Sequence, residues 1–322
     1  MMERLSQRIA HNRFVVLGRV GMDLYADPPG TRIEVAEGFV AAIGGSAANI
    51  AVALARQGAG AALLTCVSDD AVGRFCLARL RGYGVDIRHV RPVAGERRSS
   101  LAVTETVASG CQTVLYRNGA ADFALAEADV SPIDFSDAAA LVVTGTALAA
   151  EPSRGATMLA VARARAGGAL VAFDIDYRGY SWTTEEEAAS VCRAAAEACD
   201  IVVGNDIEFG LLAGSDALGA EFARGLALRG ALFTVYKRGA EGSTTFTAEA
   251  SFATPIFPVA ARKPTGAGDG FMAGLLAGLA QGQGLEAAVR RGAATAALIV
   301  AGIGCAPASP DQAALTRFIA AF

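Results

Sequence analysis

Short runs of apolar residues alternate with amphipathic segments along most of the 322-residue chain. Runs of about five apolar residues that end in glycine or aspartate are typical of strands buried on both faces, as in a parallel sheet. The segments between them carry apolar side chains at helical spacing. Strands are predicted at residues 14–18, 62–67, 141–145, 170–174, 201–204 and 232–236. This alternation predicts an α/β fold in which helices cover both faces of a mostly parallel central sheet.

Two stretches depart from this rhythm. Residues 28–42 are polar, with short alternating pieces, and residues 99–107 and 112–117 flank a turn as the arms of a β-hairpin do. We expect these stretches to form a small antiparallel sheet that stands off the main one as a lid. The lid segments are placed at about 24–43 and 97–118, as insertions in a single domain spanning residues 1–322.

Composition narrows the function classes. Hydrophobic residues make up 53% of the chain and charged residues 19%, so the chain is globular rather than disordered. The formal net charge of −4, without a block of like charges, argues against nucleic acid as the main partner. The chain has only two histidines, His11 and His89, which disfavours a histidine zinc site or a histidine-based catalytic triad.

Cysteine spacing and hydropathy bear on the compartment. The six cysteines show no C-x-x-C pair and lie mostly in apolar surroundings, as buried thiols of a reducing compartment do. No signal-like segment opens the chain, and no uninterrupted apolar run reaches membrane-spanning length. We therefore expect a soluble cytoplasmic protein with no membrane partner.

The strongest chemical signal is the loop Gly266-Ala267-Gly268-Asp269, which leads into the apolar run 271–279. A loop of small residues at the start of a helix presents free N–H groups and a favourable dipole to an anion. An aspartate there would repel phosphate unless it has a chemical task, such as taking a proton from an attacking hydroxyl. Taken alone, the loop fits a capping aspartate on a core helix equally well.

Two earlier features are compatible with the same site. Gly44 and Gly45 precede a predicted helix whose first turn carries Asn49, and paired glycines let a ligand approach the backbone. Asp23 follows the first predicted strand, and ligands of open α/β sheets bind beyond the carboxyl ends of strands. A plain glycine turn and a solvated turn aspartate are the alternative interpretations.

These motifs, together with Asn205-x-x-Glu208 between them, resemble the ribokinase-like (PfkB-type) carbohydrate kinases over nearly the whole chain. The resemblance implies an ATP-dependent sugar kinase with a ribokinase-like three-layer sandwich, a mostly parallel central sheet and a small β-sheet lid. It further implies a homodimer formed through the lid. In this interpretation Asp269 is the catalytic base, and the N–H groups of Gly266, Ala267 and Gly268 hold the charge of the transferring phosphoryl group.

The resemblance also implies residues for each ligand. Sugar hydroxyls would be bound by Asp23, Gly44, Gly45 and Asn49. Glu208 is the implied metal residue, acting with Asn205 on Mg²⁺ and the phosphates mainly through water. The other residues implied for the nucleotide are Lys237, Gly239, Gly242, Thr265, Ala294 and Ala297.

Within this family the chain resembles the sugar-acid branch, which includes 2-keto-3-deoxygluconate kinases and, more closely, the 5-dehydro-2-deoxygluconokinases of inositol catabolism. The similarity lies in Asp174-Ile175-Asp176-Tyr177-Arg178 with Trp182, and in Leu115-Tyr116-Arg117. Arg117 and Arg178 over a sugar pocket suit a carboxylate, which the guanidinium fork binds with two hydrogen bonds. The alternatives are a solvated lid residue for Arg117 and a phosphate contact for Arg178.

Two positions depart from the family pattern. Lys263 stands where many members have an aspartate that helps to bind a monovalent cation, so we predict activity nearly independent of K⁺. Gly179 stands where close relatives tend to have proline, which leaves the exact substrate open. The expected reaction is transfer of the ATP γ-phosphate to a primary hydroxyl of a keto-deoxy sugar acid. The alternatives are a fructose or ribose kinase, a nucleoside kinase, or a catalytically idle sensor.

Overall fold

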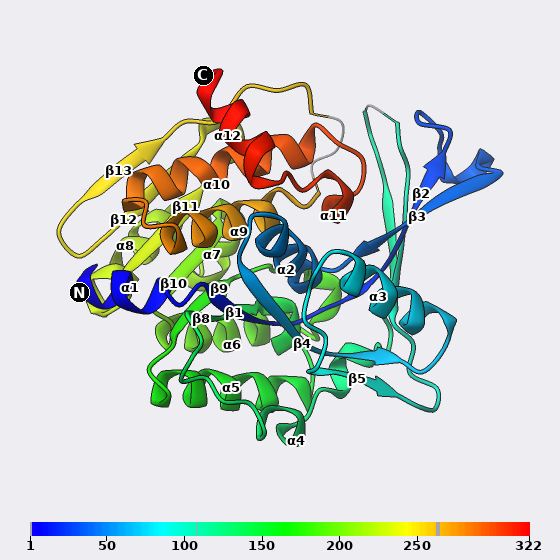
Figure 1. Ribbon diagram of the computed structural model, residues 1–322, viewed down its shortest axis with the longest axis horizontal. Coiled ribbons are helices and arrows are strands. Elements are labelled where there is room, and N and C mark those ends of the chain that lie inside the picture. The colour runs from blue at the N-terminus through cyan, green and yellow to red at the C-terminus, as the bar shows by residue number, and fades with distance from the viewer. Residues whose placement is uncertain (1, 108, 262–264) are drawn as a thin grey trace.

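The computed structural model describes residues 2–107, 109–261 and 265–322 (Figure 1). Lys263, on which the prediction of K⁺ independence rests, lies outside these residues. Within them, nine strands form one large sheet in the order β13-β12-β11-β10-β9-β8-β1-β4-β5. In that order the strands are Ser251–Thr254, Ser243–Phe246, Phe233–Lys237, Ile201–Asn205, Leu170–Asp174, Ala140–Thr144, Arg13–Leu17, Gly60–Ser68 and Val90–Val93.

The sheet is parallel from β5 to β11, and only β12 and β13 pair antiparallel at one edge. The predicted parallel strands are therefore confirmed to within about two residues at each end. The sequence analysis did not predict β5, β12 and β13. These edge strands have partly exposed residues, so they lack the continuous apolar run that marks a buried strand.

Helices cover both faces of the sheet, which gives the expected three-layer sandwich (Figure 1). Neighbouring residues of β1 show the two faces: Phe14 and Val16 pack in one core cluster, and Val15 and Leu17 in the other. One cluster contains residues of α1 (Met2–Ile9), α2 (Ser46–Arg56), α3 (Ala71–Gly82), α9 (Ala267–Ala280) and α10 (Leu285–Val300). The other contains residues of α4 (Glu127–Val130), α5 (Ser153–Ala166), α6 (Glu185–Glu197), α7 (Asp206–Ala213) and α8 (Gly219–Arg229). Two short helices near the C-terminus, α11 (Cys305–Ala308) and α12 (Gln312–Ala320), pack against α10.

A second, four-stranded sheet projects from the main body beside α3, as the lid segments predict (Figure 1). Its order is β3-β2-β6-β7, with strands Gly38–Gly44, Gly21–Asp27, Ser100–Thr104 and Thr113–Tyr116. The pairs β2–β3 and β6–β7 are antiparallel, but β2 and β6 run parallel. The expectation of a wholly antiparallel lid is thus wrong at its centre, because β2 and β6 both leave the main body in the same direction.

This arrangement changes the place of one candidate residue. Asp23 lies inside lid strand β2 rather than in a turn after a strand of the main sheet. The piece 31–35, which alternates like a strand, contains the 3₁₀ turn Ile33–Val35 instead. Across the described ranges, no helix combines the length and the apolarity needed to cross a lipid bilayer.

Candidate active site

The loop before α9 has the backbone that the glycine motif predicts. Gly266 takes a left-handed conformation, with φ of 85°. A Cβ at this position would lie 2.2 Å from Cys305 Sγ, so only glycine fits without displacing the thiol. Gly266 is itself the N-cap of α9, and no side chain caps the helix. The first N–H groups of α9 therefore remain available to an anion.

Asp269 lies in the first turn of α9 and is 9% exposed. Its Oδ2 accepts a hydrogen bond of 2.8 Å from Asn49 Nδ2, which comes from α2. Burial raises the pKa of Asp269 to about 6, helped by the nearby charge of Asp176 and opposed by the Asn49 hydrogen bond and by Arg178 and Arg19. The carboxylate therefore bonds to a side chain far along the chain and does not serve as the helix cap. Its pKa suits a base that works near neutral pH.

The paired glycines at the end of β3 lie against β2 and the residues before it. A Cβ at Gly44 would fall 2.0 Å from Asp23 Oδ1, and one at Gly45 would fall 2.5 Å from the Arg19 carbonyl oxygen. The Tyr25 hydroxyl donates to Asp23 Oδ2 at 3.1 Å. The glycines are thus required for close packing within the protein, whether or not a ligand also approaches them.

Arg178 follows β9 and is partly exposed at the edge of the site. Its guanidinium lies 2.7 Å from Asp176 Oδ1, and 4.0 Å from Glu208 Oε1. Asp176 has a positive φ of 37° and also accepts a hydrogen bond of 3.1 Å from Thr146 Oγ1. The charge of Asp176 raises the pKa of Arg178 further above its usual range. Arg178 is therefore held toward the site by a carboxylate of its own loop.

Arg117, in contrast, is buried. Its Nη2 lies 2.6 Å from Asp122 Oδ2, and both side chains are only 4% exposed. The guanidinium also donates to Ser181 Oγ at 3.0 Å and to the Thr146 carbonyl at 3.1 Å, and lies over the Phe123 ring. Arg117 is therefore not a solvated lid residue. Its charge is balanced by Asp122, where it joins the end of the lid to the main body.

The Asn205-x-x-Glu208 motif forms a capping box at the start of α7. Asn205 Oδ1 accepts from the Glu208 N–H at 2.8 Å, and Glu208 Oε2 accepts from the Asn205 N–H at 2.7 Å. The other oxygen of the buried Glu208 carboxylate accepts from the Tyr177 N–H at 3.2 Å. In the part of the chain that the structure describes, no group of three or more His, Cys, Asp or Glu side chains could hold a metal ion.

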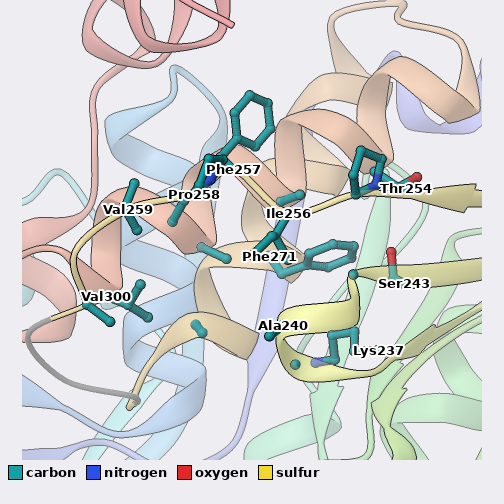
Figure 2. Close-up of a pocket in the computed structure, with 18 of the residues that line it drawn as sticks. Lys237, Ala240, Ser243, Thr254, Ile256, Phe257, Pro258, Val259, Phe271 and Val300 are labelled. Atoms are coloured by element: carbon teal, nitrogen blue, oxygen red, sulfur yellow. The ribbon is translucent and has the colours of Figure 1, made fainter.

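An apolar cavity of about 480 Å³ opens beside the start of α9 (Figure 2). In Figure 2 the segment 254–259 runs along one side of it, Lys237 and Ala240 lie on the other, and Phe271 stands between them. A Cβ at Gly268 would lie 3.2 Å from Lys237 Nζ, so the lysine amine approaches the glycine loop. The lining residues from the sequence-derived set are Lys237, Gly239, Gly242, Ala267, Gly268 and Ala297.

The cavity lining does not include three other residues implied for the nucleotide, namely Asn205, Thr265 and Ala294. Ala294 is fully buried, and its neighbours Ala293, Ala296 and Ala297 line the cavity instead. Thr265 is exposed, and its carbonyl accepts a long hydrogen bond of 3.5 Å from Cys305 Sγ. Successive residues of a helix are turned by about 100°, so Ala294 lies on a different side of α10 from Ala293 and Ala297, which line the cavity.

The chain is similar to known proteins over nearly its whole length. The model of the pfkB family of carbohydrate kinases matches residues 11–312. The chain belongs to this family. It is 37% identical to a 5-dehydro-2-deoxygluconokinase of Photobacterium profundum, over 95% of the chain and 94% of that protein. It is 35% identical to a protein of the same name from Geobacillus kaustophilus, over 95% and 93%.

Solved structures agree with the fold. The fructokinase of Vibrio cholerae O395, in its fructose-, ADP- and calcium-bound form, superposes with a TM-score of 0.84 at 27% identity, over 96% of this chain and 99% of that one. The aminoimidazole riboside kinase of Salmonella enterica, complexed with aminoimidazole riboside and an ATP analogue, gives 0.81 at 25% identity, over 95% and 99%. The ribokinase-like fold and the carbohydrate kinase class expected from the sequence are thereby confirmed.

The site of this pfkB kinase also contains charged residues that the sequence analysis left without a role. Burial raises the pKa of Asp174, at the end of β9, to about 7, while Lys237 opposes the shift and Glu208 and Asp176 add to it. Asp176 acts on both Arg178 and Asp269, and Arg19 acts on Asp269. Asp174 and Asp176 could have been found from their place at the end of a predicted strand. Arg19 would have been harder to predict as a site residue, because it is a single charged residue in a loop.

Proposed function

We propose that this kinase transfers the γ-phosphoryl group of ATP to a primary hydroxyl of a keto-deoxy sugar acid of the 5-dehydro-2-deoxygluconate type. The observation that carries the reaction is the buried Asp269 in the first turn of α9, directly after Ala267 and Gly268, which line the apolar cavity. The substrate class is supported by the names of the relatives that share 33–37% of their residues with this chain over 95% of its length.

In this proposal Asp269 accepts the proton of the acceptor hydroxyl as its oxygen attacks the γ-phosphorus. The N–H groups of Gly266, Ala267 and Gly268, with the α9 dipole, stabilise the charge on the transferring phosphoryl oxygens. Lys237, whose Nζ lies near Gly268, adds a positive charge on the nucleotide side. The adenine occupies the apolar cavity beside Ala297.

Mg²⁺ would neutralise charge on the ATP phosphates. It prefers oxygen ligands and keeps several waters, so a site with few direct protein ligands suits it. The carboxylates of Asp174, Asp176 and Glu208 act on one another electrostatically at the carboxyl ends of β9 and β10. Because Glu208 already accepts two backbone hydrogen bonds, we infer that it holds the metal through water.

The lid would close over the sugar, with Asp23 and Asn49 binding its hydroxyls, and exclude water that would otherwise hydrolyse ATP. A homodimer through the lid is supported by exposed apolar side chains on its strands, namely Phe39, Val40, Val114 and Tyr116. We propose a cytoplasmic location for the enzyme, where ATP is supplied.

A kinase for neutral sugars is the second candidate. It is supported by the similarity to the Vibrio cholerae fructokinase, and by the finding that Arg117 and Arg178 each already pair with a carboxylate. A coupled assay of ADP release over a panel of sugar acids, neutral sugars and nucleosides separates the candidates. We expect kcat/KM for the sugar acid to exceed that for fructose, ribose and nucleosides by at least about tenfold. A preference for a neutral sugar would select the second candidate, and no ADP release with any acceptor would indicate an idle sensor.

A further inference from the structure

Three arginines act on the acceptor side of the site, and they differ in how their charges are balanced. Arg117 is paired with Asp122, and Arg178 with Asp176. Arg19 makes no ion pair with any residue that the structure describes. Its Nη1 donates to Ser100 Oγ at 3.3 Å, and its Nε is buried without a hydrogen-bond partner. Arg117 Nε is likewise buried without a partner, so the difference lies in the charge: of the three arginines, Arg19 is the one whose charge no carboxylate among the described residues balances.

The backbone of Arg19 is held firmly in place. Its carbonyl accepts from the Ala48 N–H at 3.3 Å, and Gly45 packs against the same oxygen. Ser100, which its guanidinium contacts, begins lid strand β6 opposite Gly21 of β2. The side chain thus lies between the base of the lid and the first turn of α2.

That first turn carries Asn49, whose amide donates to Asp269. The charge of Arg19 acts on this carboxylate, since it opposes the burial that raises the pKa of Asp269. A ligand that contacts Arg19 would therefore lie within electrostatic reach of Asp269.

Arg19 is half-buried, and a guanidinium charge withdrawn from water without a carboxylate partner is unfavourable. A carboxylate would accept two parallel hydrogen bonds from the guanidinium fork, and it would also balance the charge of the guanidinium. A neutral hydroxyl could accept hydrogen bonds from the guanidinium but would leave its charge unbalanced.

We propose that Arg19 is the specificity-determining residue that binds the carboxylate of the acceptor sugar acid. This assignment rests on the proposed function. Arg178 and Arg117 then act as positioning residues, one fixed by Asp176 beside Asp269 and the other by Asp122 at the base of the lid. The carboxylate, rather than the sugar hydroxyls, would supply the discrimination against neutral sugars.

The test compares 5-dehydro-2-deoxygluconate with its carboxamide, which keeps the shape and removes the charge. We expect wild-type enzyme to prefer the acid strongly. Arg19→Ala should lower kcat/KM for the acid by roughly 10- to 100-fold, as expected for loss of a charged hydrogen-bonding pair, and leave the carboxamide nearly unchanged. Arg19→Lys should give an intermediate loss, because it keeps the charge and loses the fork. KM for ATP should stay at the wild-type value.

Two further variants are matched controls. Arg178→Ala should lower kcat/KM for acid and carboxamide alike, and Arg224→Ala, an exposed arginine on α8, should change neither. Thermal unfolding of each variant checks that it is folded. If Arg19→Ala does not fold, Arg19→Lys still provides the test. Equal losses for both substrates in the Arg19 variants, or a loss of the acid preference in Arg178→Ala instead, would overturn the assignment. A wild-type enzyme that prefers neutral acceptors would overturn the proposed function and the role of Arg19 together.

Discussion

The nucleotide side and the acceptor side of this site are built in different ways. The cavity beside α9 is lined by glycine, alanine and apolar side chains, with Lys237 as the charged group that approaches the loop. The acceptor side is a set of charged side chains, in which Asp176 pairs with Arg178 and Asn49 donates to Asp269. An apolar cavity suits an adenine ring because of its shape. The position of each charged side chain, in contrast, is fixed by the group with which it pairs.

The difference shows where substrate choice can vary in such a kinase. A cavity of small residues and backbone tolerates few changes without losing its volume. On the acceptor side, a change in one charge alters the partner available to the others and hence what the site will bind. We therefore expect substitutions on the two sides to have separable effects on ATP and on the acceptor.

The largest effect on kcat is expected from a substitution of Asp269, which lies where the nucleotide side and the acceptor side meet. Asp269→Asn keeps the shape of the side chain and removes the base, so kcat should fall by a factor on the order of 10² or more while both substrates still bind. Steady-state kinetics with direct binding of each substrate would measure this. Glu286→Gln, a change in the first turn of α10, is the matched control and should leave kcat unaltered. Wild-type turnover in Asp269→Asn would remove Asp269 from the mechanism.

A substitution in the apolar cavity is expected to have a smaller effect, and only on KM for ATP. Ala297→Leu adds bulk where we place the adenine, so KM for ATP should rise by roughly tenfold while KM for the acceptor changes little. Ala287→Leu, at an exposed position of the same helix, serves as the control. If KM for both substrates rose together, the two sides would not be independent.

The pH profile tests the charges around Asp269. The base must be ionised to accept a proton, so kcat/KM should rise with pH through a midpoint near the pKa of about 6. Asn49→Ala removes a hydrogen bond that favours the carboxylate and should move the acid limb to higher pH. Asp176→Asn removes a neighbouring negative charge and should move it to lower pH. Shifts in the same direction in both variants would contradict this account.

The smallest effect is expected from monovalent cations. If the charge of Lys263 replaces that of a bound cation, exchange of K⁺ for choline at matched ionic strength should leave kcat nearly unchanged. Lys263→Asp should then introduce a dependence on K⁺. A several-fold stimulation of the wild-type enzyme by K⁺ would refute the interpretation.

Much of the architecture was predictable from the sequence. The apolar runs located the parallel strands, and Gly266 to Asp269 located the start of α9, because both depend on interactions between residues near one another in the chain. The facing side of α10 was not predictable. Ala294 and Ala297 have the same side chain and pack in one cluster with Phe257 and Leu315, yet only Ala297 lines the cavity.

The sequence by itself determined the fold class and the glycine loop with the aspartate at its end, since helix periodicity, glycine conformation and strand burial are local properties. The tertiary structure decided which charges are already balanced. Arg117 and Arg178 looked equivalent as single residues, yet each proved to be paired with a carboxylate, while Arg19 makes no ion pair with any residue that the structure describes. Charge balance depends on groups that meet only after folding, as Asn49 meets Asp269 across 220 residues. That balance sets what the acceptor side can bind.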